Sequence, residues 1–132
     1  MEKLQNLKDE IWHEIGMSKG GKVCYSISNM GRCKRQNLIT GEVIVDRGRR
    51  NRFTGYWHFQ NLGYVHRLVA RYFVPNDRPD EWTEVDHISS NRDQNQASNL
   101  RWVDLRFNRS RRHANKLRSA HHRHTSHKGM ML

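Results

Sequence analysis

The sequence has few apolar residues and no long apolar run. Only 35% of its 132 residues are hydrophobic, and no stretch approaches the roughly 18 consecutive apolar residues that a membrane-spanning helix needs. We therefore expect that the protein is not an integral membrane protein. The first five residues, Met1 to Gln5, lack the apolar core of a secretory signal peptide, so we expect the protein to act in the cytoplasm of a host cell.

Cysteine is also scarce. Cys24 and Cys33 are too few for a disulfide scaffold and do not have C-x-x-C spacing. The low number of cysteines fits a protein of a reducing compartment. We expect both cysteines to be small core residues with free thiols. The four Trp, four Tyr and four Phe argue for a packed core rather than a disordered chain.

Acidic residues are outnumbered by basic ones. There are 24 Lys and Arg against 13 Asp and Glu, which gives a net charge of +11. Residues 101–132 carry a net charge of +8, and a second basic cluster spans residues 46–52. A single charge run is often only a solvated surface. Two clusters of the same sign in so short a chain favour a polyanionic partner, with nucleic acid the first candidate.

The pattern of the first 63 residues predicts mainly strands. Leu4, Leu7, Ile11 and Ile15 recur at helical spacing and predict a short amphipathic helix that enters a strand near Trp12. Further strands are expected at 23–28, 33–35, 42–45 and 55–60, with turns at 29–31 and 37–41. We interpret this region as a small antiparallel sheet with the basic cluster at a hairpin tip.

The pattern changes after residue 63. Apolar residues at helical spacing predict a helix over 65–73. A strand at 84–88, a polar loop at 89–98 and a strand at 100–103 follow. Asp104 is a good N-cap for a basic helix from Leu105 to about Arg118. The fold class is therefore α+β, with a β-rich region at 1–63, a strand–loop–strand–helix region at 64–118 and a flexible basic tail at 119–132.

The strand–loop–strand–helix segment carries the residues best suited to chemistry. Asp86 and His87 end the first strand, Asn99 precedes the second strand, and Asn108 lies about one turn into the helix. A neutral imidazole is a suitable base near pH 7, and carboxylate and amide oxygens suit Mg²⁺ or Mn²⁺. We expect Asp86 and Asn108 to bind one such ion, His87 to activate water for phosphodiester hydrolysis, and Asn99 to orient the imidazole.

These residues also carry a family resemblance. The segment V-D-H-I-S-S-N-R-D-Q-N-Q-A-S-N-L-R-W-V, followed by D-L-R-F-N, resembles the HNH nuclease motif, a ββα-metal fold, in the variant that ends in Asn. This variant is typical of phage homing endonucleases carried in group I introns. Upstream, Y-S-I-S-N-M-G-R, G-Y-W-H-F-Q and V-H-R-L-V-A-R-Y-F resemble the DNA-binding module that commonly precedes HNH in those proteins. The resemblance covers roughly residues 12–112.

The resemblance implies an activity and a set of roles. His87 would activate water, Asp86 and Asn108 would bind one divalent ion with the scissile phosphate, and Asn99 would brace the metal loop. Cleavage of double-stranded DNA would leave 5′-phosphate and 3′-hydroxyl ends, and many relatives nick one strand as monomers. We expect the protein to be encoded by a phage or an intron and to act in a bacterial host. Because no C-x-x-C pair flanks the motif, we expect no structural zinc. We also expect no small-molecule cofactor.

Two groups of basic residues are expected to contact DNA. A two-stranded ribbon fits the major groove, where arginine can bridge guanine O6 and N7, and the helix beside the metal site can hold the phosphates that flank the cut. The hairpin group is Arg47, Arg49, Arg50 and Arg52, and the helix group is Arg106, Arg109, Arg111, Arg112 and Lys116.

Alternatives remain open at this point. The protein could be a non-catalytic, basic nucleic-acid-binding module with a degenerate HNH fold, or a broad-specificity HNH nuclease. Asn95 is either a second loop brace or only a turn former. His66, on the helix expected at 65–73, is more readily a structural residue than a phosphate contact. Trp57 and Trp102 are expected to pack in the fold rather than stack on bases.

Overall fold

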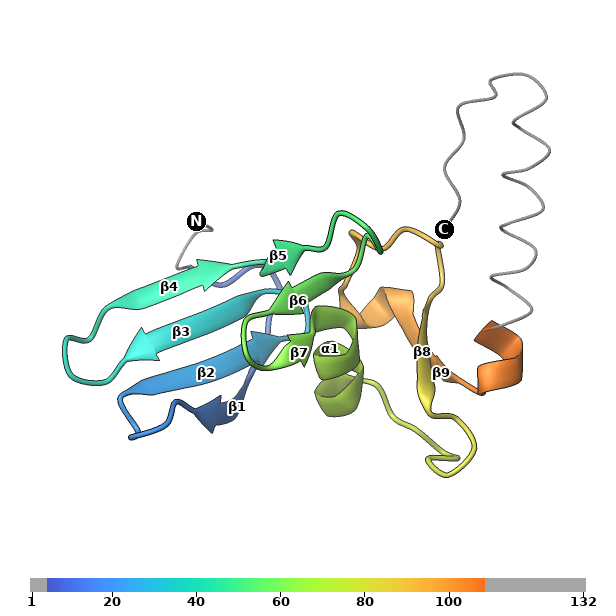
Figure 1. The fold of residues 1–132 in the computed structure, drawn as a ribbon, viewed down its shortest axis with the longest axis horizontal. Helices are drawn as coiled ribbons and strands as arrows, with labels where there is room; N and C mark the ends of the chain where they lie inside the picture. The colour runs from blue at the N-terminus through green and yellow to red at the C-terminus, as the bar shows by residue number, and fades with distance from the viewer. Residues whose placement is uncertain (1–4, 109–132) are drawn as a thin grey trace, which may run out of the picture.

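The computed structural model describes residues 5–108, so most of the predicted basic helix and the whole predicted tail lie outside the described residues. Three small antiparallel sheets surround one helix, α1 (Val65–Phe73), in an α+β arrangement (Figure 1). This confirms the predicted fold class. Within residues 5–108, no helix has the length and apolar character needed to cross a membrane.

The first sheet is a four-stranded meander. Its strands are β1 (Trp12–Met17), β2 (Val23–Ser28), β3 (Cys33–Asn37) and β4 (Val43–Asp46), and they lie in the order β1-β2-β3-β4. Gly31 adopts a φ of 81° in the β2–β3 turn, a conformation that glycine tolerates best. The side chain of Asn37 closes the β3–β4 turn, where it accepts the backbone N–H groups of Ile39 and Thr40. Both turns lie where the sequence predicts them.

The prediction of an amphipathic helix near the N-terminus is wrong for residues 5–11. Residues 5–11 form no helix and contain a turn only at residues 8–9, and Leu7 and Ile11 are 41% and 61% exposed. The cause is a buried ion pair that fixes this segment on the sheet. Arg32, which is 1% exposed, donates from Nε and Nη2 to the Glu10 carboxylate at 3.0 and 2.5 Å and from Nη2 to the Gln5 carbonyl at 2.9 Å.

The second sheet has three short strands, so the single sheet expected over 1–63 is in fact two. Its strands are β5 (Arg49–Arg50), β6 (Trp57–Phe59) and β7 (Gly63–Tyr64), in the order β5-β6-β7. At the tip of the β5–β6 hairpin, the Asn51 side chain accepts the N–H groups of Phe53 and Thr54 at 2.8 and 3.1 Å. The basic cluster therefore lies only partly at the hairpin tip expected from the sequence, because Arg49 and Arg50 form strand β5 and only Arg52 lies in the turn.

The third sheet pairs β8 (Glu84–His87) with β9 (Leu100–Val103), and a 3₁₀ turn, η1 (Ala97–Asn99), precedes β9. The register places Asp86 opposite Arg101 and His87 opposite Leu100. Residues 105–108 are helical, and Asp104 Oδ1 accepts the N–H of Phe107 at 2.6 Å. The predicted strands, loop and N-cap are therefore confirmed.

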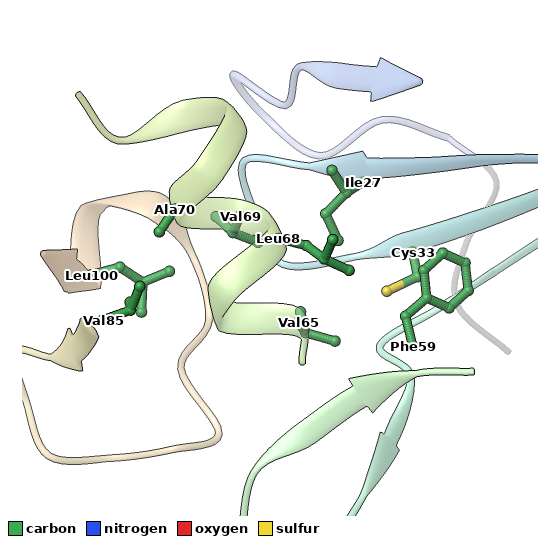
Figure 2. Close-up of a cluster of buried hydrophobic side chains, with 9 residues drawn as sticks. All are labelled: Ile27, Cys33, Phe59, Val65, Leu68, Val69, Ala70, Val85 and Leu100. Atoms are coloured by element: carbon green, nitrogen blue, oxygen red, sulfur yellow. The ribbon is translucent and has the colours of Figure 1, made fainter. Parts of the chain in front are cut away.

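Helix α1 forms the centre of one core (Figure 2). Its buried residues pack toward Ile27, Cys33 and Phe59 of the first two sheets on one side and toward Val85 and Leu100 of the third sheet on the other. Cys33 is a buried free thiol, and so is Cys24, as the sequence predicts. The core is shared across the boundary proposed after residue 63, so the β-rich region holds the β8–β9 hairpin in a fixed place.

Candidate active site

His87 lies at the end of β8 with its side chain buried at 5% exposure. Its Nε2 is 2.7 Å from Oδ1 of Asn95. Because an amide oxygen can only accept, Nε2 carries the proton in this contact, and the basic lone pair of the neutral ring lies on Nδ1. Asn95 is therefore a side chain that can orient the imidazole, and the orienting role expected of Asn99 stays a prediction.

Asn95 is itself held by the β2–β3 turn. A Cβ at Gly31 would lie 3.0 Å from backbone and side-chain atoms of Asn95, so the glycine permits a close approach. Two residues further on, the N–H of Ala97 donates to the carbonyl of Asn29 at 2.7 Å. Sequence reasoning noted Asn95 only as a loop brace or turn former, because these contacts join segments more than 60 positions apart.

Asn99 closes the loop that connects β8 to β9. Its Oδ1 accepts the N–H of Ser89 at 3.1 Å, and its Nδ2 donates to the carbonyl of Gln94 at 2.9 Å. Its own carbonyl accepts the N–H of Ile88 at 2.8 Å. These contacts brace the loop from within, which agrees with the loop-bracing part of the expectation. A catalytic role for Asn99 stays a prediction.

Asp86 lies beside His87 but interacts with a different part of the site. Its carboxylate is 6% exposed and accepts Nε of Arg101 at 2.9 Å across the β8–β9 ladder. The Arg101 guanidinium lies 4.8 Å from the ring centroid of Phe107. Asp86 is thus linked through Arg101 to the helical turn that carries Asn108. The Asn108 residue is half-buried. Coordination of one ion by Asp86 and Asn108 stays a prediction.

The rings of Tyr56 and His66 stack on each other beside the candidate base. Tyr56 and His66 have centroids 4.8 Å apart and planes 17° apart, and His66 lies 4.9 Å from the His87 ring. His66 is 5% exposed, and its buried Nδ1 has no hydrogen-bond partner. The buried position of His66 supports the prediction that it is a structural residue rather than a phosphate contact.

The burial of both imidazoles keeps them neutral at physiological pH. Burial lowers the pKa of His66 to about 3, and electrostatic interactions with His87, Arg67 and Arg92 act in the same direction. Burial also lowers the pKa of His87, although the hydrogen bond to Asn95 partly opposes this. A neutral His87 can accept a proton from water.

The oxygen donors at the site suit a hard divalent cation. Among residues 5–108 no three His, Cys, Asp or Glu side chains are grouped to form a complete cage. One buried carboxylate, with an amide on the adjoining helix, fits Mg²⁺ or Mn²⁺, because these ions commonly keep several waters and share a substrate phosphate.

The described basic residues of both predicted DNA-binding groups lie at the surface. Arg47, Arg49, Arg50, Arg52 and Arg106 are exposed, and Arg109, Arg111, Arg112 and Lys116 lie outside the described residues. The indoles of Trp57 and Trp102 donate to Asp93 Oδ1 and to the carbonyl of Val74. These two contacts within the fold agree with a packing role for both tryptophans.

Comparisons with known proteins indicate one family. Residues 63–109 match the family model described as HNH endonuclease. The chain is 35% identical over 100 residues to "Uncharacterized HNH endonuclease L247" of Acanthamoeba polyphaga mimivirus, an alignment that covers 73% of this chain and 24% of that protein. It is 32% identical over 103 residues to "Uncharacterized HNH endonuclease L245" of the same virus, covering 70% and 29%. The chain therefore spans about a quarter of the length of these curated relatives.

A solved structure shows a similar arrangement. The structure of "DNA binding and cleavage by the HNH homing endonuclease I-HmuI" aligns with a TM-score of 0.50 and 27% identity, over 80% of this chain and 59% of that chain. The alignment extends well beyond the residues that match the family model. Residues 63–109 therefore match the HNH endonuclease family in sequence, and the described structure is similar to that of an HNH homing endonuclease.

Proposed function

We propose that the protein is a homing-type endonuclease that hydrolyses a phosphodiester bond of double-stranded DNA with one Mg²⁺ or Mn²⁺ ion. The observation that carries this proposal is the buried His87 imidazole, held by Asn95 at 2.7 Å beside the buried Asp86 carboxylate, in a segment that matches the HNH family. General base catalysis requires a neutral imidazole held in one orientation, and the bond to Asn95 supports that orientation.

The chemistry follows from the placement of each group. His87 accepts a proton from water at Nδ1, while the bond from its Nε2–H to Asn95 keeps the ring in place and favours the imidazolium that forms. Asp86, positioned by Arg101, and Asn108 would hold the divalent ion. When bound, this ion supplies positive charge that offsets the charge on the phosphorane and on the departing 3′ oxygen. The products are 5′-phosphate and 3′-hydroxyl ends.

Binding to DNA is assigned to the basic surfaces. The exposed arginines of the β5–β6 hairpin would enter the major groove, and Arg106 with the basic residues that follow it would hold phosphates near the cut. One catalytic site meets one scissile phosphate at a time, so we propose that a monomer nicks one strand at a defined site.

A plasmid assay tests the proposal. Supercoiled plasmid is incubated with the wild type, Asp86→Ala or His87→Ala, in Mg²⁺ or in EDTA, and DNA affinity is measured in parallel by gel shift. We expect Mg²⁺-dependent nicking by the wild type alone, with DNA affinity retained in both variants. DNA binding without metal-dependent nicking by the wild type would favour the non-catalytic alternative.

The same assay, read by run-off sequencing of the nicked strands, tests specificity. A site-specific nickase gives one discrete end on one strand of a long substrate. A smear of ends over both strands would instead identify the broad-specificity nuclease.

A further inference from the structure

Two consecutive residues of the β8–β9 loop attach it to the β5–β6 hairpin. Arg92 Nη1 donates to the carbonyl of Thr54, and the Arg92 guanidinium lies 4.4 Å from the ring centroid of Tyr56. At the next position, Asp93 Oδ1 accepts the indole N–H of Trp57 at 2.8 Å and lies 3.4 Å from Arg50 Nε. The loop is therefore joined to both strands of the hairpin and to its tip.

The same loop holds the candidate base. Asn95, which receives Nε2–H of His87, lies two residues after Asp93 and three after Arg92. A displacement of Arg92 would therefore reach Asn95 through a short stretch of backbone. The Tyr56 ring provides a second connection, since it stacks on His66, which lies 4.9 Å from His87.

Arginine is well suited to this junction. Its planar guanidinium can donate in its plane to a carbonyl while one face covers an aromatic ring. A lysine ammonium is a point charge that cannot make both contacts with the same geometry. The arrangement thus uses the shape of Arg92 as well as its charge.

We propose that Arg92 is a positioning residue that couples DNA contact at the β5–β6 hairpin to the placement of His87. The hairpin presents Arg49 and Arg52 to solvent and contacts the loop through Tyr56 and Thr54. DNA that engages the arginines sets the position of the hairpin relative to the β8–β9 loop, and Arg92 transmits that position to Asn95. This proposal rests on the proposed endonuclease function.

The first test separates positioning from binding. Arg92→Gln and Arg92→Lys are compared with Arg78→Gln, a matched control in which the arginine also covers an aromatic ring, that of Trp82. The measurements are the single-turnover cleavage rate at saturating DNA, the Kd for DNA and the melting temperature.

Both Arg92 variants should lose about 10- to 100-fold in rate, the usual effect of removing a residue that orients a catalytic group. Their Kd should stay within about twofold of the wild type, and Arg78→Gln should match the wild type in rate. An unchanged rate in Arg92→Gln, or a rate that falls only in proportion to a lost melting temperature or DNA affinity, would overturn the proposal.

A double-mutant cycle tests the coupling itself. Arg52→Gln should slow saturated cleavage in the wild-type background but add little further loss in the Arg92→Gln background. Purely additive losses would show that the hairpin acts independently of Arg92 and would refute the coupling.

A readout without cleavage separates this proposal from the proposed function. The ¹⁵N signals of the His87 imidazole are recorded without metal or DNA in the wild type and in Arg92→Lys, which keeps the positive charge that acts on His87. A shifted or broadened His87 signal in the variant supports positioning by Arg92 even if the wild type does not cleave DNA. An unchanged signal contradicts the proposal even if the wild type cleaves.

Discussion

A buried neutral histidine should make this protein sensitive to acid. His66 is 5% exposed, its Nδ1 has no partner, and burial lowers its pKa to about 3. In the unfolded chain the pKa returns to about 6.5. As the pH falls below 6.5 the unfolded chain binds a proton that the folded chain does not, so stability decreases with falling pH. Between pH 7 and pH 4.5 this group alone should remove about 2.5 kcal/mol from the free energy of unfolding.

Urea unfolding at both pH values measures this effect. His66→Phe keeps a ring between Tyr56 and His87 but removes the titrating group, so the variant should lose about 2.5 kcal/mol less than the wild type on acidification. His58→Gln, on β6, serves as the matched control and should follow the wild type. An equal pH-dependent loss in His66→Phe and the wild type would refute the assignment of a buried, neutral His66.

Three further predictions concern the groups that support the site. Burial raises the pKa of Glu10, but hydrogen bonds from Arg32 and from a backbone N–H outweigh this and lower it. Stability from this pair should therefore be lost as the pH falls through the lowered pKa, and Glu10→Gln should cost about 3 kcal/mol in urea unfolding. Asn95→Ala should reduce single-turnover cleavage by about 10- to 100-fold while DNA affinity in gel shifts is unchanged. Gly31→Ala should cost about 1–2 kcal/mol in thermal unfolding, because φ is 81° and the new Cβ would lie 3.0 Å from Asn95; a variant as stable as the wild type would contradict the close packing there.

The elements with strong local patterns could be predicted from the sequence. Apolar spacing alone located α1 at Val65–Phe73, because one face of a helix must meet the core. The strands around the polar loop and the Asp104 cap were also predicted, since each depends on residues close in sequence. The positions of Asp86 and His87 at the end of β8 follow from the same reasoning.

The features that depend on contacts between distant segments could not be predicted. The spacing of Leu7 and Ile11 indicated a helix, but the buried pair of Glu10 with Arg32 holds that segment in a non-helical conformation. The orientation of His87 by Asn95 became visible only when the loop was seen folded against the β2–β3 turn.

The central claim is that Asp86 and Asn108 hold one divalent ion next to the His87 base. The most direct measurement is a crystal structure of the chain with DNA and Mn²⁺, in which anomalous scattering locates the ion. We expect one peak within about 2.0–2.3 Å of a carboxylate oxygen of Asp86 and the amide oxygen of Asn108, with His87 Nδ1 turned toward a water beside the scissile phosphate. A peak bound to His87 itself, or to neither Asp86 nor Asn108, would contradict the account.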